Sequence, residues 1–219
     1  MSFLQPPFWA STGSRLTAPH AVSVRVVDPL VPLVEPLTLA QGKLRAGLEW
    51  TAGDPRDDLM LGFISAARSK VEQDTGLALP LQTRDVFFDA ISGVLTLPAQ
   101  STPLQSVTSL TYTDSAGVDH VVDPATYVVD LASGRLGLAL GGAWPTDLRP
   151  FQPYVLRIVS GWPTVAALTA EAPLLVQAVG LLTAHYATLG RDLASPEALA
   201  AVPQGYDDLI SSYVPVVVP

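Results

Sequence analysis

Residues 71–89 read VEQDTGLALPLQTRDVFFD, and this stretch contains an abrupt change of pattern. A helical repeat ends at Thr75-Gly76, and an alternating, strand-like pattern begins within a few residues. Gly76 is the expected end of the helix, because glycine adopts the positive φ of a C-terminal cap without a steric cost. The chain is therefore predicted to form a short helical layer first and to turn directly into β-structure.

Two helices are predicted before this change. The first begins at Thr38-Leu39-Ala40-Gln41, which has the pattern of a capping box, and it carries Leu44 and Leu48 one turn apart on the same face. The second helix begins with Asp54 as the N-cap and Pro55 in the first helical position. Its apolar stripe has a 3.6-residue period and consists of Met60, Phe63, Ile64, Ala67 and Val71, with Arg68, Lys70, Glu72 and Gln73 mostly on the opposite side.

The sequence changes character between residues 81 and 162, where short apolar runs alternate with turn signals. Without helical patterns between them, such runs indicate an antiparallel sheet or a small sandwich. The predicted strands are 82–89, 94–97, 106–113, 118–122, 126–130, 135–139 and 154–160.

A last long helix follows at residues 174–189, with Pro173 in its first turn. The segment is apolar nearly all round, which predicts a helix buried on most sides. A membrane span is disfavoured, because the run is shorter than about 20 residues and contains Gln177 and His185. A short helical turn is expected near residues 209–213.

These patterns predict an α+β fold, in which two N-terminal helices and a buried C-terminal helix form a small bundle with an inserted antiparallel β-region. The predicted organisation is an extended N-terminal arm at 1–36 with a possible strand at 22–27, a helical hairpin at 37–80, the β-insertion at 81–162, a C-terminal helical part at 163–213 and an extended apolar tail at 214–219.

Composition restricts the classes of function. Charged residues make up only 15% of the 219, which favours a component of an assembly, because subunits cover one another's surfaces. The net charge of −8, without any run of Lys or Arg, argues against binding to a phosphate backbone. The absence of cysteine excludes disulfides, thiolate nucleophiles and cysteine metal ligands.

No catalytic or cofactor site is predicted. His20, His120 and His185 lie in unrelated segments, so a metal site is not expected, and His185 is interpreted as a hydrogen-bonded residue at a packing face. The paired carboxylates Asp57 with Asp58 and Asp85 with Asp89 are explained by a helix N-terminus and by the solvated face of an edge strand. Neither a nucleophile elbow nor a phosphate-binding glycine loop is present.

Two terminal segments are better candidates for function, because they concentrate apolar residues that a monomer would expose. An extended, β-branched tail is suited to adding to the sheet edge or groove of a partner, although it could also fold back on its own sheet. The candidate partner-binding residues are Phe3, Phe8 and Trp9 in the arm, and Tyr213, Val214, Pro215, Val216, Val217, Val218 and Pro219 in the tail.

The order of several segments resembles the head-tail connector proteins, also called adaptor or head completion proteins, of tailed bacteriophages and gene-transfer agents. The segments are LTLAQGKLRAGL, DDLMLGFISAARSKVEQDTGLAL, PLQSVTSLTYTDSAGV, YVVDLASGRLGL, YVLRIVSGWP and APLLVQAVGLLTAHYATL, which together span about residues 37–213. The most specific is the second, in which an acidic residue, Thr75, Gly76 and a small apolar run lead from helix to strand. The long N-terminal arm and the strongly apolar C-terminus depart from the family pattern.

The resemblance implies a structural, non-enzymatic virion protein without a cofactor. Its copies would form a homo-oligomeric ring, a dodecamer, beneath the portal in the neck of the virion, after synthesis in the host cytoplasm. The ring would extend the DNA channel, its C-terminal segment would bind the portal protein, and its other side would receive the next neck or tail protein. DNA would pass without specific binding, and no membrane is involved.

Net negative charge agrees with a channel that repels phosphates, provided that the acidic side chains face it. That hypothesis would fail if the arginines lined the lumen, namely Arg15, Arg25, Arg135, Arg149 and Arg157. The alternatives are a β-sandwich module that binds a carbohydrate or a protein, with Trp144 and Trp162 as stacking platforms, and another neck or tail component such as a stopper or a tail terminator.

Overall fold

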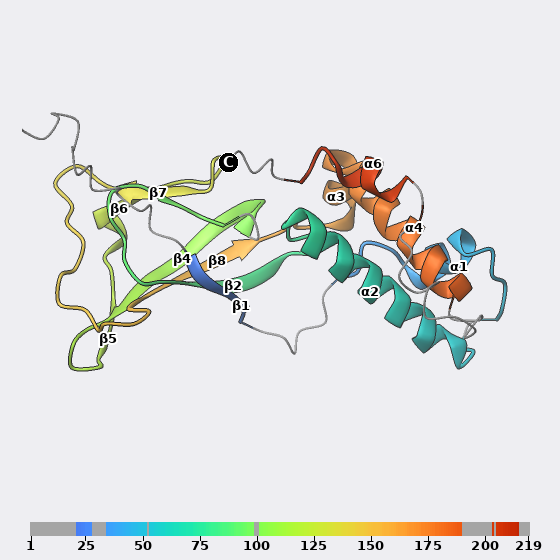
Figure 1. Cartoon of the computed structure of the whole chain (residues 1–219), viewed down its shortest axis with the longest axis horizontal. Coiled ribbons are helices and arrows are strands. Elements are labelled where there is room, and N and C mark those ends of the chain that lie inside the picture. Colours follow the sequence, from blue (N-terminus) through green and yellow to red (C-terminus); the bar gives the residue numbers. More distant parts are fainter. Residues whose placement is uncertain are drawn as a thin grey trace, which may run out of the picture.

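The structure is a computed structural model that describes residues 21–27, 34–51, 53–98, 101–189, 203 and 205–214. Helices gather at one end of an elongated molecule and strands at the other (Figure 1). The two ends meet where the sequence changes pattern, because α2 (Arg56–Thr75) ends at Gly76 and β2 (Gln82–Phe88) begins six residues later. Gly76 has a φ of 70°, and its N–H donates to the carbonyl oxygen of Glu72 at 2.8 Å, so it ends the helix as predicted.

The helical end is built around α4 (Pro173–Leu189), which contacts each of the other four described helices. Its buried residues lie on most of its circumference, and they pack against Met60, Ile64 and Ala67 of α2. The capping box predicted at Thr38 is present. The other helices are α1 (Leu39–Arg45), α3 (Val165–Glu171) and α6 (Tyr206–Ile210).

The strands form two antiparallel sheets that face each other. The five-stranded sheet has the order β1 (Ala21–Val26), β2, β8 (Tyr154–Ser160), β4 (Leu104–Thr113) and β5 (Asp119–Val121), and the three-stranded sheet has the order β3 (Leu95–Thr96), β7 (Arg135–Leu138) and β6 (Tyr127–Asp130). Alternate residues of both sheets share one hydrophobic core, including Phe88, Leu136 and Leu156. The fold is therefore α+β, with a helical bundle and antiparallel strands inserted between its helices, as predicted.

One carboxylate joins the helical end to the sheet. Glu72, in the last turn of α2, accepts hydrogen bonds from the N–H of Leu79 at 2.9 Å and from Nε2 of Gln82 at 3.3 Å. Its other oxygen accepts from Arg68 Nη1 at 2.5 Å. Arg68 is 8% exposed and also donates to Glu35 at 2.9 Å, so the buried guanidinium is paired on two sides.

A second junction forms where β8 returns to the helices. Pro80 pairs with Trp162 in a short parallel bridge, and Trp162 donates its N–H to the carbonyl of Leu79 at 3.1 Å. Gly161, with a φ of 101°, lies so close to Pro80 that a Cβ atom would overlap the Pro80 carbonyl oxygen. Only glycine therefore fits between the two backbone segments.

Several local predictions were wrong in detail. Leu48 packs against the helical core, but Leu44 is 80% exposed, because α1 buries Gly42 and Lys43 instead. Arg68 was placed on the polar side of α2 and is buried in the ion pairs described above.

The start of α2 and the number of helices also differ from prediction. The N-cap is Pro55 rather than Asp54, and the Asp54 carboxylate accepts from the N–H of Arg56 at 2.9 Å. Helix α3 was not predicted. It begins at Thr164, whose hydroxyl accepts from the N–H of Ala167 at 3.0 Å.

Replacing Glu72 with alanine should destabilise the whole molecule. The substitution leaves the N–H of Leu79 without its acceptor and removes one of the two carboxylates on Arg68, so we expect the free energy of unfolding to fall by about 2 to 3 kcal/mol. Chemical denaturation measures this value. Glu49→Ala, at an exposed position, is the control and should change it by less than about 0.5 kcal/mol. Equal stability of the two variants would show that the carboxylate does not hold the junction.

Gly161→Ala should be more damaging than an alanine at another glycine with positive φ. Gly53 has a φ of 87° with open space around it, so Gly53→Ala adds only backbone strain, about 1 to 2 kcal/mol. Gly161→Ala adds the overlap with Pro80, and we expect a loss of more than about 3 kcal/mol, or no soluble protein. Thermal unfolding followed by circular dichroism compares the two, and similar melting temperatures would contradict the close approach.

Candidate functional site

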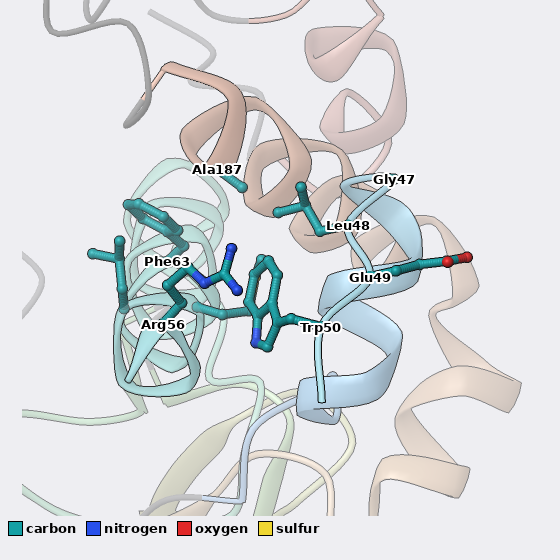
Figure 2. Close-up of a pocket in the computed structure, with 9 residues that line it drawn as sticks. Gly47, Leu48, Glu49, Trp50, Arg56, Phe63 and Ala187 are labelled. Carbon is teal, nitrogen blue, oxygen red and sulfur yellow. The ribbon is translucent and has the colours of Figure 1, made fainter. Parts of the chain in front are cut away.

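A groove opens at the end of the bundle that lies away from the sheets, and we call it the bundle-end groove. It is a cavity of about 370 Å³ between the segment that follows α1, the first two turns of α2 and the end of α4. Figure 2 shows Leu48 and Ala187 on one side, with Phe63 and Arg56 facing them and Trp50 between. The principal lining residues are Leu48, Trp50, Arg56, Leu59, Phe63 and Ala187.

Polar and charged neighbours hold Trp50 in a fixed orientation. Its indole Nε1 donates to Asp57 Oδ1 at 2.6 Å. The Lys43 ammonium lies 4.9 Å from the centre of a Trp50 ring and the Arg56 guanidinium 4.6 Å from it, both within the range of cation–π attraction. The indole is thereby positioned before any partner arrives, which lowers the entropic cost of binding against it.

Asp57 is the centre of this arrangement. Besides Trp50, it accepts from the backbone N–H of Gly53 at 2.8 Å and forms an ion pair with Lys43 at 2.5 Å. These bonds, that of Lys43 first and that of Trp50 second, hold the pKa of Asp57 below its ordinary value, so the carboxylate stays charged at neutral pH. From the sequence, Asp57 was expected only to stabilise the N-terminus of a helix.

Uncovered apolar side chains surround the groove. Leu59 is 55% exposed on α2, and Phe63 one turn later is half-buried. Leu44 lies on the adjoining hollow, which shares Leu48 and Trp50 with the groove. Contiguous apolar surface of this kind marks a place where another protein segment binds.

The described part of the C-terminus is attached firmly to the bundle. Tyr206 of α6 is 1% exposed, and its hydroxyl donates to Asp74 of α2 at 2.7 Å. Burial, and then this hydrogen bond, raise the pKa of Tyr206 far above its ordinary value. Tyr213 packs, half-buried, against the helical core, whereas Val214 is 40% exposed. Both residues were predicted to contact a partner. In the structure, Tyr213 is packed within its own subunit, whereas Val214 is exposed.

The remaining predicted partner-binding residues lie outside the described residues. They are Phe3, Phe8 and Trp9 of the arm and Pro215, Val216, Val217, Val218 and Pro219 of the tail. Their assignment to interfaces therefore stays a prediction.

The carboxylate pairs do not form an acid–base site among the described residues. Asp85 accepts two hydrogen bonds from Arg157, at 2.8 and 2.9 Å, and Asp89 accepts from the N–H of Gln152 at 3.0 Å. The interpretation of their strand as an edge was wrong, because β2 lies between β1 and β8. Both carboxylates are therefore engaged by other groups of the fold, Asp85 by a guanidinium and Asp89 by a backbone N–H.

The histidines that the structure describes are also apart from each other. His120 bonds to Asp114 at 2.8 Å and stacks on Tyr112 in the β4–β5 hairpin. His185 was expected to be hydrogen-bonded, but its Nε2 atom is buried and has no hydrogen-bond partner among the described residues. Within the described ranges, no group of three or more histidines and carboxylates could hold a metal ion.

The two candidate stacking tryptophans are part of the packing. Trp162 is buried, and its indole donates to Glu171 at 3.0 Å. Trp144 is half-buried against the core of the two sheets. A buried indole face cannot receive a sugar ring, so Trp162 does not serve as a binding platform.

In the part of the chain that the structure describes, no single helix has the length and hydropathy of a membrane span; α3 and α4 meet that test only as a pair, and they are bent by 109°.

Replacing Tyr206 with phenylalanine tests the attachment of α6. The loss of the bond to a charged carboxylate should lower the free energy of unfolding by about 1 to 2 kcal/mol at pH 7. In the unfolded chain tyrosine ionises near pH 10, whereas buried Tyr206 keeps its proton. The stabilisation by Tyr206 is therefore complete below about pH 10 and decreases as the pH rises above it, because the unfolded state then binds fewer protons.

Urea denaturation at pH 7 and at several pH values above 10 measures this difference. Tyr213→Phe is the matched control, because no hydrogen bond of its hydroxyl is seen with any described residue. If Tyr206→Phe is as stable as Tyr213→Phe at pH 7, the bond to Asp74 does not anchor the helix.

Comparison with known proteins places this architecture among particle components. No family profile matches the sequence, and no curated protein matches it. Among solved structures, the chain is similar to a chain in the neck of an empty gene transfer agent particle computed with C6 symmetry, with 28% identity, a TM-score of 0.66, and coverage of 90% of this chain and 97% of the other. It is also similar to a chain in the virion of a native gene transfer agent particle, with 26% identity, a TM-score of 0.66 and the same coverage.

A third similar chain comes from the neck of a native gene transfer agent particle computed with C12 symmetry. The identity is 26% and the TM-score 0.59, with coverage of 86% of this chain and 97% of the other. Helical bundle and sheets are thus matched together, and the proteins that this chain resembles are structural parts of a virus-like particle.

Proposed function

We propose that the protein is a head-tail adaptor, which forms a ring beneath the portal in the virion neck and extends the DNA channel. The observation that carries the proposal is the similarity, over 90% of the chain, to a neck component that is itself 97% covered. A shared fragment such as a common sheet would cover much less of either chain. The neck structures were computed with C6 and C12 symmetry, which supports a homo-oligomeric ring of about twelve copies.

The surfaces of the described residues support a structural role. Exposed apolar side chains occur at both ends of the molecule, with Leu59 at the bundle and Phe151 at the sheets, as expected for a subunit with neighbours on several sides. The described residues contain no converging set of catalytic groups. We therefore infer a structural protein that acts without a cofactor and reaches the virion neck after synthesis in the host cytoplasm.

The pairing of two arginines supports passage of DNA without binding. Arg157 is paired with Asp85, and the guanidinium of Arg149 donates to the backbone carbonyl of Gln152. A paired or internally bonded arginine attracts phosphate less than a free one does, and the net charge of −8 repels it. We infer that the duplex passes the ring without specific contacts.

We assign portal docking to the C-terminal segment that starts at Tyr213. Because Tyr206 fixes α6 on α2, the start of this segment is held at a defined place on the bundle, and its second residue, Val214, is exposed. The opposite side of the ring would receive the next neck or tail protein. A stopper or a tail terminator is the alternative within the same assembly.

Light scattering on the purified chain, alone and mixed with capsids that carry a portal but no neck, tests the proposal. We expect about twelve copies of the 23.1 kDa chain per capsid, and at least a tenfold loss of binding when residues 214–219 are deleted. Val121→Ser, at an exposed position on β5, is the control and should bind normally. If the chain stays a monomer and does not bind capsids, the adaptor assignment is overturned. If binding is unchanged after the deletion, residues 214–219 do not dock on the portal.

A further inference from the structure

We propose that the bundle-end groove binds the N-terminal arm of an adjacent copy, with Phe8 and Trp9 as its anchors. This inference rests on the proposed ring, since it needs a second copy beside the first. It assigns a partner to a surface that the adaptor role leaves unexplained.

The chemistry of the groove fits a segment rich in proline and aromatic residues. Trp50 and Phe63 offer aromatic surface (Figure 2), and Leu59, which also lines the cavity, offers an exposed aliphatic wall. The arm contains FLQPPFW at residues 3–9. Consecutive prolines favour an extended backbone that docks against aromatic side chains, and phenylalanine and tryptophan are frequent anchors of interfaces.

The charge of the groove edge also suits the arm. Glu49 borders the cavity, points away from it in Figure 2, and makes no ion pair with any residue that the structure describes. Arg15 is the only charged side chain within residues 1–20, so the arm is a cationic segment of an acidic protein. The cations at the groove, Lys43 and Arg56, are already paired with Asp57 and Asp54, so Glu49 is the carboxylate at this edge that is free to attract Arg15.

The reach of the arm disfavours its own groove. The arm enters the fold at Ala21, which pairs with Phe88 at the end of β2 that lies away from the helices. From there the path to the groove runs along β2, about 20 Å, and then along α2 to Met60, about 22 Å, and the elements follow one another along the molecule (Figure 1). The twelve residues from Trp9 to Ala21 span at most about 43 Å when fully extended.

The arm would thus need to be completely straight, and to run back along its own sheet, to place Trp9 in its own groove. The groove of a neighbour in a ring has no such constraint. Each copy then uses two different surfaces, an arm and a groove, which is the head-to-tail contact that closes a ring. The arm would consequently link each subunit to the next one in the same direction.

Cysteine crosslinking in the full chain tests this contact, because the natural sequence contains no cysteine. The double variant Ala10→Cys with Thr51→Cys keeps Phe8, Trp9 and Leu59, because Thr51 is an exposed residue of the adjoining hollow; it is purified, assembled with portal-bearing capsids and oxidised. We expect a ladder of disulfide-linked multimers on a non-reducing gel, which a reducing agent collapses to 23.1 kDa. The matched control joins Ala10→Cys to Leu140→Cys, a fully exposed position at the sheet end, and should yield no ladder above background.

The outcomes separate this inference from the adaptor assignment. If light scattering shows the ring but the double variant gives no ladder, or only an internal disulfide at monomer mass, the arm does not bind the neighbouring groove and the adaptor role stands. If no ring forms at all, the adaptor assignment fails, and the inference fails with it.

A charge in the groove provides a second measurement that does not depend on crosslinking. Leu59→Lys should reduce the fraction of ring at least fivefold, while Leu59→Met should leave it within twofold of the natural protein. Position 59 is 55% exposed, so neither change should alter the melting temperature measured by circular dichroism. Equal ring fractions for the two variants would overturn the inference.

Discussion

The structure depends on the carboxylate of Glu72. It is still part of α2, yet it receives the backbone N–H of Leu79 and the side chain of Gln82 beyond the helix end. Gly76 reverses the chain, and Glu72 determines the direction in which the chain then leaves. Because Arg68 donates to both Glu72 and Glu35, the segment before α1 is tied to this point as well.

This junction explains how one chain carries two separate cores. The helical core surrounds α4, and the second core lies between the two sheets. The two cores do not share residues, so a change in the packing of one does not have to be compensated in the other. Only short segments connect them, among which the pair Pro80 and Trp162 leaves no space for a side chain at residue 161. Apolar surface is consequently available at both ends of an elongated subunit, which suits a position between two different partners.

Much of this fold could be predicted because its signals are local. The capping box at Thr38, the terminating Gly76 and the strand runs between 82 and 160 each depend on neighbours within a few residues, and the structure contains them. The burial of Arg68 was missed because one of its partners, Glu35, lies 33 residues earlier. Exposure of Leu44 was missed for a similar reason, since the path of α1 over α4 decides which face of α1 is covered.

The bundle-end groove, too, could be predicted from the sequence only in part. Trp50 and Asp57 are only seven residues apart, and an aspartate at the start of a helix could have been paired with the preceding tryptophan. The contribution of Ala187 from α4 could not have been foreseen, because it depends on how two distant helices pack. The tail and arm were singled out on apolar character alone, and composition does not identify the surface that receives them.

The attachment of α6 has a mechanical consequence. Tyr206 joins Asp74, which lies two residues beyond Glu72 on the same helix, so the segment before α1, through Glu35 and Arg68, and the C-terminal helix α6 are both attached near the last turn of α2. Tension applied beyond Val214 would pass through α6 into that turn before it reached the sheets or the rest of the bundle. The hydrogen bond would then be loaded in parallel with the packing of Tyr206 and Ile210, and a pull on the end of the chain would be resisted without unfolding α4.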